Sequence, residues 1–160
     1  KNDTTRNLIA ETTYYTRGAN DPEIFVDAMY DKERVSGTVV NATSPRTLTW
    51  TGKVAIPYPS DYGYAADLSL CQQQLEYYNN ATCTANNWMK SILGTYSHGW
   101  LLNPNSGSAD AAWCVFSSGD AGSNGIASNA YGVAPVLSLT SELDIGSGTG
   151  ESNSPYQLSV

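Results

Sequence analysis

Residues that could do acid–base or nucleophilic chemistry are few in this chain, and they are scattered. It has one histidine, His98, among 160 residues. Ser60, Asp61 and His98 have the residue types of a hydrolase triad, but no serine lies in the Gly-x-Ser-x-Gly pattern that places a nucleophile on a sharp turn. We therefore expect Asp61 to cap a turn and His98 to cap a loop. The sequence predicts no catalytic residue and no enzyme activity.

Metal-ligating residues are equally sparse. Asp144 and Glu151 flank a glycine-rich loop that could offer oxygen ligands to calcium. Two carboxylates are too few for a typical calcium loop, so a turn is the preferred interpretation. The cysteine spacing does not resemble a zinc site, which needs close Cys or His pairs. We predict no metal site and no cofactor.

The three cysteines divide into a pair and a single residue. Cys71 and Cys83 enclose a short polar segment, and a bridge between them would close a loop of about 13 residues, worth roughly 3 kcal/mol in the chain-entropy model. We predict this disulfide. Cys114 lies in the apolar run 111–116, which indicates a buried strand and a cysteine acting as a small core hydrophobe. A nucleophilic Cys114 would need His98 as its base.

Aromatic side chains are abundant, with 11 tyrosines and four tryptophans. Several tyrosines are candidate ligand contacts, because a platform of aromatic rings could stack against sugars; these are Tyr58, Tyr62, Tyr64, Tyr77 and Tyr78. The tryptophans stand in apolar contexts and are expected to pack in the core. They are Trp50, Trp88, Trp100 and Trp113.

Composition narrows the class of protein. Charged residues make up 14%, against about a quarter in typical domains. Ser, Thr, Asn, Gly and Tyr take their place, as is common in exported β-rich proteins, so we expect an extracellular or cell-surface location. The net charge of −7 argues against a nucleic-acid partner, which would require a basic stripe. No run approaches a membrane span and no signal peptide is present, so a membrane connection would require a segment upstream of Lys1.

Two or three short helices are predicted to position these residues, with three candidate segments. The first runs from about residue 22 to 32, with Asp21 as its cap and Pro22 in its first turn. The second spans residues 69–77. The third spans residues 86–94, with Gly94 as its stop.

The remaining chain is predicted to be largely extended. Residues 35–49 form extended segments around a turn at 41–45, and residues 50–59 form a strand stopped by prolines, before a turn at 60–64. Further strands are expected at 100–104, 112–117 and 156–160, with a turn at 119–125 and a return strand from 125. The clearest strand pattern is 131–139, where Pro135 indicates an edge or a bulge. The predicted class is α+β, dominated by strands.

Two regions are expected: an extended N-terminal arm, residues 1–20, and a single globular domain, residues 21–160. The arm could add as a strand to a neighbouring subunit through apolar and aromatic residues, or be a disordered leader. The candidate strand-donating residues are Leu8, Ile9, Tyr14 and Tyr15.

Two segments carry a resemblance to a known group: Trp50-Thr51-Gly52-Lys53-Val54 and the run Tyr58-Pro59-Ser60-Asp61-Tyr62-Gly63-Tyr64-Ala65. Together with the cysteines and Tyr131-Gly132-Val133-Ala134-Pro135-Val136-Leu137, they resemble a C-terminal module of exported, often pilin-like surface proteins of gut Firmicutes. The resemblance covers residues 28–160. Members often carry an upstream prepilin-type segment, which implies a subunit of a surface filament or an anchored surface protein.

A weaker similarity links the order Trp-Leu, Trp-x-Val and Gly-Val-x-Pro-Val-Leu to C-type-lectin-like domains of the formylglycine-generating-enzyme type. These domains usually have Arg before the Pro, where this chain has Ala134. The enzymes of that group use a cysteine pair near the end, whereas the last cysteine here is Cys114. The resemblance implies a lectin-like fold and argues against that enzyme activity.

We therefore expect a non-catalytic extracellular structural subunit of a filament or pilus-like assembly, with copies of itself as partners. The alternative is a lectin-like adhesin domain that binds glycan or a host surface protein through its tyrosine-rich loops.

Overall fold

A computed structural model describes residues 6–20, 24–35, 38–39, 46–93, 97–150 and 153–159. The chain is a mixture of helix (22%) and strand (29%) with small antiparallel sheets, so the α+β class is confirmed. Four α-helices and one 3-10 turn lie wholly within the described residues, where two or three short helices were predicted. In the parts of the chain that the structure describes, every helix is too short and too polar to span a bilayer.

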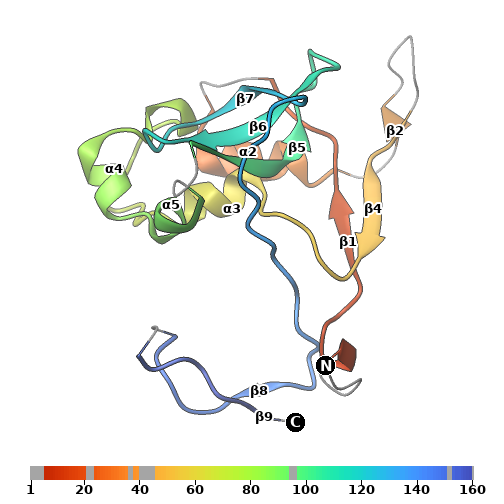
Figure 1. The fold of residues 1–160 in the computed structure, drawn as a ribbon, viewed down its shortest axis with the longest axis vertical. Helices are drawn as coiled ribbons and strands as arrows, with labels where there is room; N and C mark the ends of the chain where they lie inside the picture. The colour runs from red at the N-terminus through yellow and green to blue at the C-terminus, as the bar shows by residue number, and fades with distance from the viewer. Residues whose placement is uncertain are drawn as a thin grey trace.

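The main body is built on a three-stranded antiparallel sheet (Figure 1). It is formed by β5 (His98–Pro104), β6 (Ala111–Phe116) and β7 (Ala121–Ile126), in that order. Buried and partly exposed residues alternate along β5, as expected for a strand with one face on the core. Leu101 from β5 and Trp113 and Val115 from β6 are fully buried. These strands agree with the prediction, except that residues 121–125 belong to β7 rather than to a turn.

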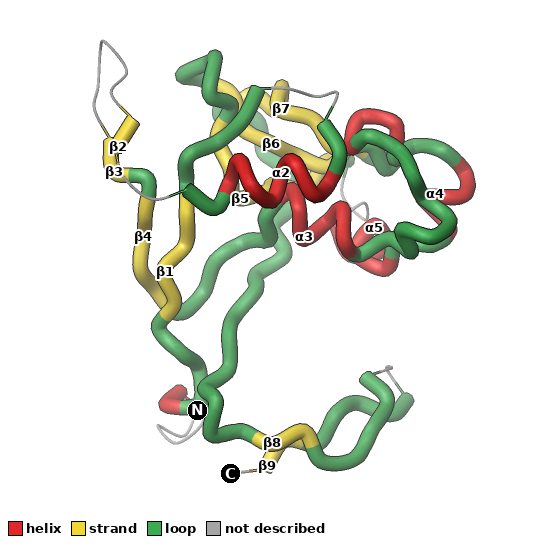
Figure 2. The backbone as a smooth tube through the Cα atoms, turned by 180° about the vertical axis from the view of Figure 1, so that it is seen from behind, coloured by secondary structure: helices red, strands yellow, loops and turns green. Residues whose placement is uncertain are grey.

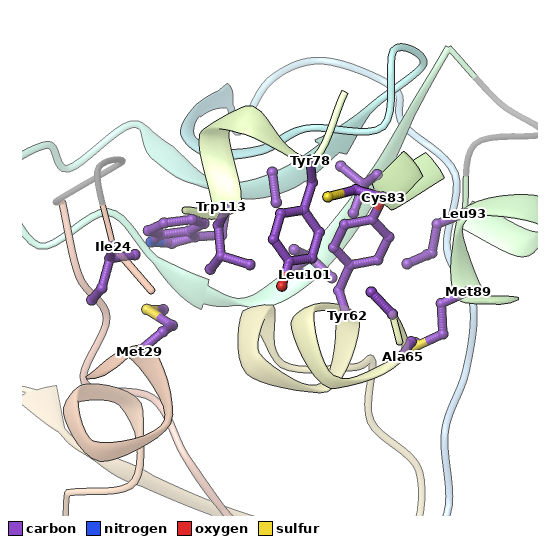
Figure 3. Close-up of a cluster of buried hydrophobic side chains, with 14 of the residues drawn as sticks. Ile24, Met29, Tyr62, Ala65, Tyr78, Cys83, Met89, Leu93, Leu101 and Trp113 are labelled. Atoms are coloured by element: carbon purple, nitrogen blue, oxygen red, sulfur yellow. The ribbon is translucent and has the colours of Figure 1, made fainter. Parts of the chain in front are cut away.

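Short helices pack beside this sheet. They are α2 (Val26–Glu33), α3 (Pro59–Tyr64), η1 (Leu75–Tyr77), α4 (Ala81–Ala85) and α5 (Trp88–Leu93). Figure 3 shows Tyr62 and Tyr78 near the middle of the main core cluster, with Trp113 and Met29 on one side and Leu93 on the other. The Trp113 indole N–H donates to the Ala19 carbonyl at 2.8 Å, so the buried ring keeps its polar atom paired.

Two of the three helix predictions need correction. Helix α2 begins at Val26 because Phe25 is in extended backbone; the predicted cap, Asp21, lies outside the described residues. Residues 69–77 contain only a turn and η1, since Asp67 accepts hydrogen bonds from the backbone and side chain of Ser69 and so stabilises the turn. Helix α5 confirms the third prediction, while Gly94 is not among the described residues.

The N-terminal arm pairs with the rest of the chain. Strand β1 (Thr12–Tyr15) lies antiparallel to β4 (Thr49–Gly52), with Tyr14 opposite Trp50. Strands β2 (Thr38–Val39) and β3 (Arg46–Thr47) also pair antiparallel, in agreement with the predicted extended segments. The predicted turn at 41–45 between them lies outside the described residues.

Residues 131–140, called the connecting segment below, leave the body and run to the C-terminal hairpin (Figures 1 and 2). The prediction of a strand at 131–139 is wrong, because this segment does not pair continuously with another strand and makes only isolated bridges to Gly99, Ala55 and Ile9. The hairpin consists of β8 (Asp144–Ile145) and β9 (Leu158–Ser159) and lies apart from the body in both views. The predicted C-terminal strand at 156–160 is thus confirmed for two residues.

Candidate functional site

The run Tyr58–Tyr64, the most specific element of the sequence resemblance, forms helix α3 instead of the predicted turn. Pro59 occupies the first turn, where its missing N–H costs nothing. Asp61 Oδ2 accepts a hydrogen bond from the Tyr58 backbone N–H at 2.9 Å, which stabilises the helix start. The Arg34 guanidinium donates to Asp61 Oδ1 at 3.0 Å and so ties α3 to the end of α2.

A buried carboxyl–hydroxyl pair lies next to this ion pair. Glu33 and Ser60 are both fully buried; the Ser60 hydroxyl donates to Glu33 Oε1, and the Ser60 N–H donates to Oε2 at 3.3 Å. Burial raises the pKa of Glu33 from its ordinary value of 4.5 to about 7, although the bonds from Ser60 and the charge of Arg34 favour the ionised form. Because neither side chain is accessible to solvent, this pair joins α2 to α3 and presents no reactive group.

Tyr58 links the N-terminal arm to Arg34 at the junction of α2 and α3. The Arg34 guanidinium carbon lies 3.8 Å from the centroid of the Tyr58 ring, and the Tyr58 hydroxyl accepts a hydrogen bond from the Tyr15 backbone N–H at 2.5 Å. A hollow of about 270 Å³ opens between the arm, Arg34 and the connecting segment. The buried Tyr14 hydroxyl, from the arm, has no hydrogen-bond partner in the described structure.

The five candidate tyrosines do not form one surface. Tyr62 and Tyr78 are buried in the core, where their hydroxyls donate to the Gly119 carbonyl at 2.6 Å and to the Gly63 carbonyl at 3.3 Å. Burial raises the pKa of both phenols, that of Tyr78 to about 12. Tyr58 is buried under Arg34, as described. Tyr64 and Tyr77 are half-exposed, and Tyr64 packs edge-on against Tyr30.

The predicted disulfide between Cys71 and Cys83 is confirmed, with a Cα–Cα distance of 4.8 Å. It joins the segment before η1 to α4, and both cysteines are buried. The third cysteine, Cys114, is buried in β6 as predicted. Burial raises the pKa of its thiol to about 12, so the thiol stays protonated near neutral pH.

The remaining reactive residues have unrelated partners. His98 stacks on Tyr131, with ring centroids 4.4 Å apart, and meets the edge of Phe116. Ser60 bonds to Glu33 and Asp61 bonds to Arg34, so among the described residues these side chains and His98 do not form a triad. Across the described ranges, no group of three or more His, Cys, Asp or Glu side chains could hold a metal ion. Of the two candidate calcium residues, Glu151 falls outside those ranges.

The residues of the predicted strand-donating arm contact their own chain. Tyr14 is buried and stacks on Trp50, with centroids 5.5 Å apart, while Tyr15 bonds to Tyr58. Ile9 bridges to Leu139, and the Leu8 carbonyl accepts from the Thr140 N–H at 3.0 Å. A neighbouring subunit would therefore receive this arm by exchange, since the arm is already paired here.

Two exposed apolar features escaped the prediction. Trp50 and Trp88 are exposed, which corrects their expected place in the core; only Trp113 is fully buried. The connecting segment presents Val133, Leu137 and Leu139 to solvent. The apolar run at 131–139 predicted a strand, but the run could not tell which of its side chains would lack a cover.

Comparison of the chain with protein-family models, with curated proteins and with solved structures gave no match.

Proposed function

We propose that this chain is a non-catalytic structural subunit of an extracellular assembly, and that copies associate along the connecting segment. The observation that carries the proposal is the uncovered apolar edge of this extended segment. From residue 133 to residue 139 every second side chain is exposed, and those of Val133 (57%) and Leu137 (49%) leave about half of their surface in water. Exposed apolar surface of this kind is typical of interaction sites.

The backbone of the same segment is paired on one side. Residues 132, 136, 138 and 140 exchange hydrogen bonds with His98 and Trp100, with Ala55, and with the arm. The intervening residues 133, 137 and 139 have no backbone hydrogen bond to any described residue. In extended backbone the N–H and C=O groups of successive residues alternate between the two edges, so those of residues 133, 137 and 139 are left for a further strand.

The second strand that we propose is the same segment of another copy. Exposed edges are usually protected by charged side chains, especially lysine. Residues 131–140 contain no charged residue, although the chain carries a net charge of −7. Two such segments can therefore lie antiparallel without like-charge repulsion, and Pro135 removes only one N–H from each. This contact would be the same patch on both subunits, related by a two-fold axis.

The C-terminal hairpin offers a second surface for growth beyond a dimer. Its exposed apolar residues are Ile145, Tyr156 and Leu158. An assembly with two distinct self-contacts can continue into a filament, whereas a single two-fold contact closes as a dimer. The hairpin lies away from the body, so both surfaces can be occupied together (Figure 2).

The location outside the cell and the finer fold are part of the same proposal. The Cys71–Cys83 bridge supports an oxidising compartment. A C-type-lectin-like arrangement of the body, as the sequence resemblance implies, is compatible with a small antiparallel sheet flanked by short helices. An experimental structure of the chain would test that arrangement.

Assembly can be tested by sedimentation and electron microscopy over a range of concentrations. We expect the wild-type chain to form dimers and larger species, and Leu137→Lys to remain monomeric because a buried ammonium would oppose the contact. Leu70→Lys is the matched control, since Leu70 is similarly exposed but lies beside the disulfide. A wild-type chain that stays monomeric at high concentration would refute the proposal. Assembly that Leu137→Lys leaves intact would favour exchange of the N-terminal arm instead.

A further inference from the structure

Helices α4 and α5 enclose an open hollow of about 650 Å³ on a face that the proposed assembly does not use. Its lining combines the large aromatic ring of Trp88 with the polar side chains of Thr84, Asn86, Asn87, Lys90 and Ser91. Trp88 is 64% exposed, the most exposed tryptophan among those described. Exposure of so much apolar ring surface to water is unfavourable, and aromatic residues are enriched at binding sites.

The hollow is held in shape before any ligand arrives. Asn87 is buried, and its Oδ1 accepts hydrogen bonds from the N–H groups of Met89 and Lys90 at 3.0 and 3.2 Å, which orders the first turn of α5. The amide nitrogen of Asn86 donates to the Thr82 carbonyl at 2.8 Å. On the other side, the disulfide at Cys83 anchors α4. A site that is already ordered loses little entropy when it binds.

Lys90 supplies a charge at this site. Its aliphatic carbon Cε lies 3.5 Å from the position that a Cβ would take on Gly119, so its stem rests on the turn between β6 and β7. Its ammonium has no ion pair or hydrogen bond to any residue that the structure describes. An unpaired cation in a chain of net charge −7 favours an anionic ligand at this point.

Asn86 adds an uncharged acceptor. Since its amide nitrogen is engaged with Thr82, its Oδ1 remains as an acceptor without a described partner. The lining therefore offers an apolar ring face, a hydrogen-bond acceptor and a cation within a few residues of one another. A pyranose that carries a carboxylate has the complementary groups: an apolar C–H face, hydroxyl donors and one negative charge.

We propose that this hollow binds an acidic saccharide, with the sugar ring packed on Trp88, a hydroxyl donating to Asn86 Oδ1 and the carboxylate paired with Lys90. The proposal moves glycan recognition away from the tyrosines, three of which are buried. It does not depend on the connecting segment, so a failure of assembly would leave it standing.

Binding can be followed by NMR through the indole N–H signals of the four tryptophans, with methyl glucuronide as the acidic probe and methyl glucoside as its neutral match. Trp88→Phe assigns the relevant signal. We expect the glucuronide to shift the Trp88 signal in a saturable way at millimolar concentrations. Lys90→Gln should weaken glucuronide binding about fivefold, the effect of a partly exposed ion pair, and leave glucoside binding unchanged.

The control is Ile92→Ala, because Ile92 is exposed on the same helix but does not line the hollow; this variant should bind as the wild type does. Trp88→Ala should abolish binding, which is followed here through the signals of the sugar because the indole signal is gone, while its melting temperature shows an intact fold. The proposal is wrong if neither sugar shifts the Trp88 signal, if the shifts occur at Trp50 or Trp100 instead, or if Lys90→Gln weakens both sugars equally.

Discussion

Replacing Glu33 by glutamine tests how the junction between α2 and α3 is held. The glutamine side chain has nearly the same shape, but it cannot ionise and its single oxygen can accept only one of the two hydrogen bonds from Ser60. In the wild type the carboxyl is fully buried, and burial raises its pKa from 4.5 to about 7. The variant therefore removes one proton equilibrium, together with one hydrogen bond from Ser60 and the ion pair with Arg34, so the test rests on how the difference changes with pH and not on its value at one pH.

The size and sign of the effect follow from the pKa. When the folded-state pKa is higher than the unfolded one, the folded protein holds a proton that the unfolded chain has lost, so stability falls as pH rises between the two values. The difference between the ordinary pKa of 4.5 and the folded-state pKa of about 7, at 1.36 kcal/mol per pKa unit, corresponds to about 3 kcal/mol of unfolding free energy. The stabilising contribution is complete below pH 4.5 and is lost as the pH passes about 7.

The measurement is urea unfolding of wild type and Glu33→Gln, followed by tryptophan fluorescence, to which the buried Trp113 contributes. Other groups titrate in both proteins and cancel in the difference between the two unfolding free energies. We expect that difference to move in favour of the variant by about 3 kcal/mol as the pH rises from about 4 to 8. Glu11→Gln, at an exposed position, controls for the exchange of glutamate for glutamine. A constant difference, or one that moves the other way, would refute the assignment of Glu33 as a buried carboxyl whose ionisation is costly.

Two further predictions concern covalent and steric constraints in the core. Removing the disulfide with Cys71→Ser and Cys83→Ser together should lower the free energy of unfolding by about 3 kcal/mol, because the unfolded chain regains the entropy that the closed loop had removed. Reduction of the wild type should have the same effect. A loss well under 1 kcal/mol would contradict the prediction. Gly63→Ala should cost roughly 1–3 kcal/mol in urea unfolding, since the new Cβ would lie 2.4 Å from Val26 Cγ2. Adding Val26→Ala should then recover part of the loss, and strict additivity of the two changes would argue against a steric cause.

Features that depend on neighbouring residues were predictable. The Cys71–Cys83 bridge, the buried strand around Cys114 and helix α5 each follow from residue types within about a dozen positions. Helix α3 was missed for a physical reason. Pro, Ser, Asp and Gly favour both turns and helix starts, so the run 58–64 reads equally as either. Contact with Glu33, distant in sequence, decides for the helix.

The connecting segment shows a different limit. Its run of apolar residues predicted a strand, and exposed and partly buried residues do alternate along 132–140. Yet the segment meets three separate partners, Gly99, Ala55 and Ile9, and forms no ladder with any of them. The pattern of side chains reports which residues face the protein; it does not report whether one continuous strand lies alongside.

Which tyrosines are buried could not be predicted from the sequence, for a similar reason. A phenol can be buried when its hydroxyl finds an acceptor, and for Tyr62 that acceptor is the carbonyl of Gly119, far along the chain. Composition cannot reveal such a partner. The same argument explains Trp88: an indole followed by apolar residues looks like a core residue, but the turn of α5 directs Met89 and Leu93 inward and leaves Trp88 outside.

Almost every side chain in the run Tyr58–Tyr64 contacts another part of the same chain. Tyr58 and Asp61 engage Arg34 and the arm, Ser60 engages Glu33, and Tyr62 fills the core. Only Tyr64 is left half-exposed. Because the polar groups of this run already have partners within the chain, few of them remain to bind a ligand. Contacts with other molecules must then come from surfaces that folding does not need, and the connecting segment and the Trp88 hollow are two that meet this condition.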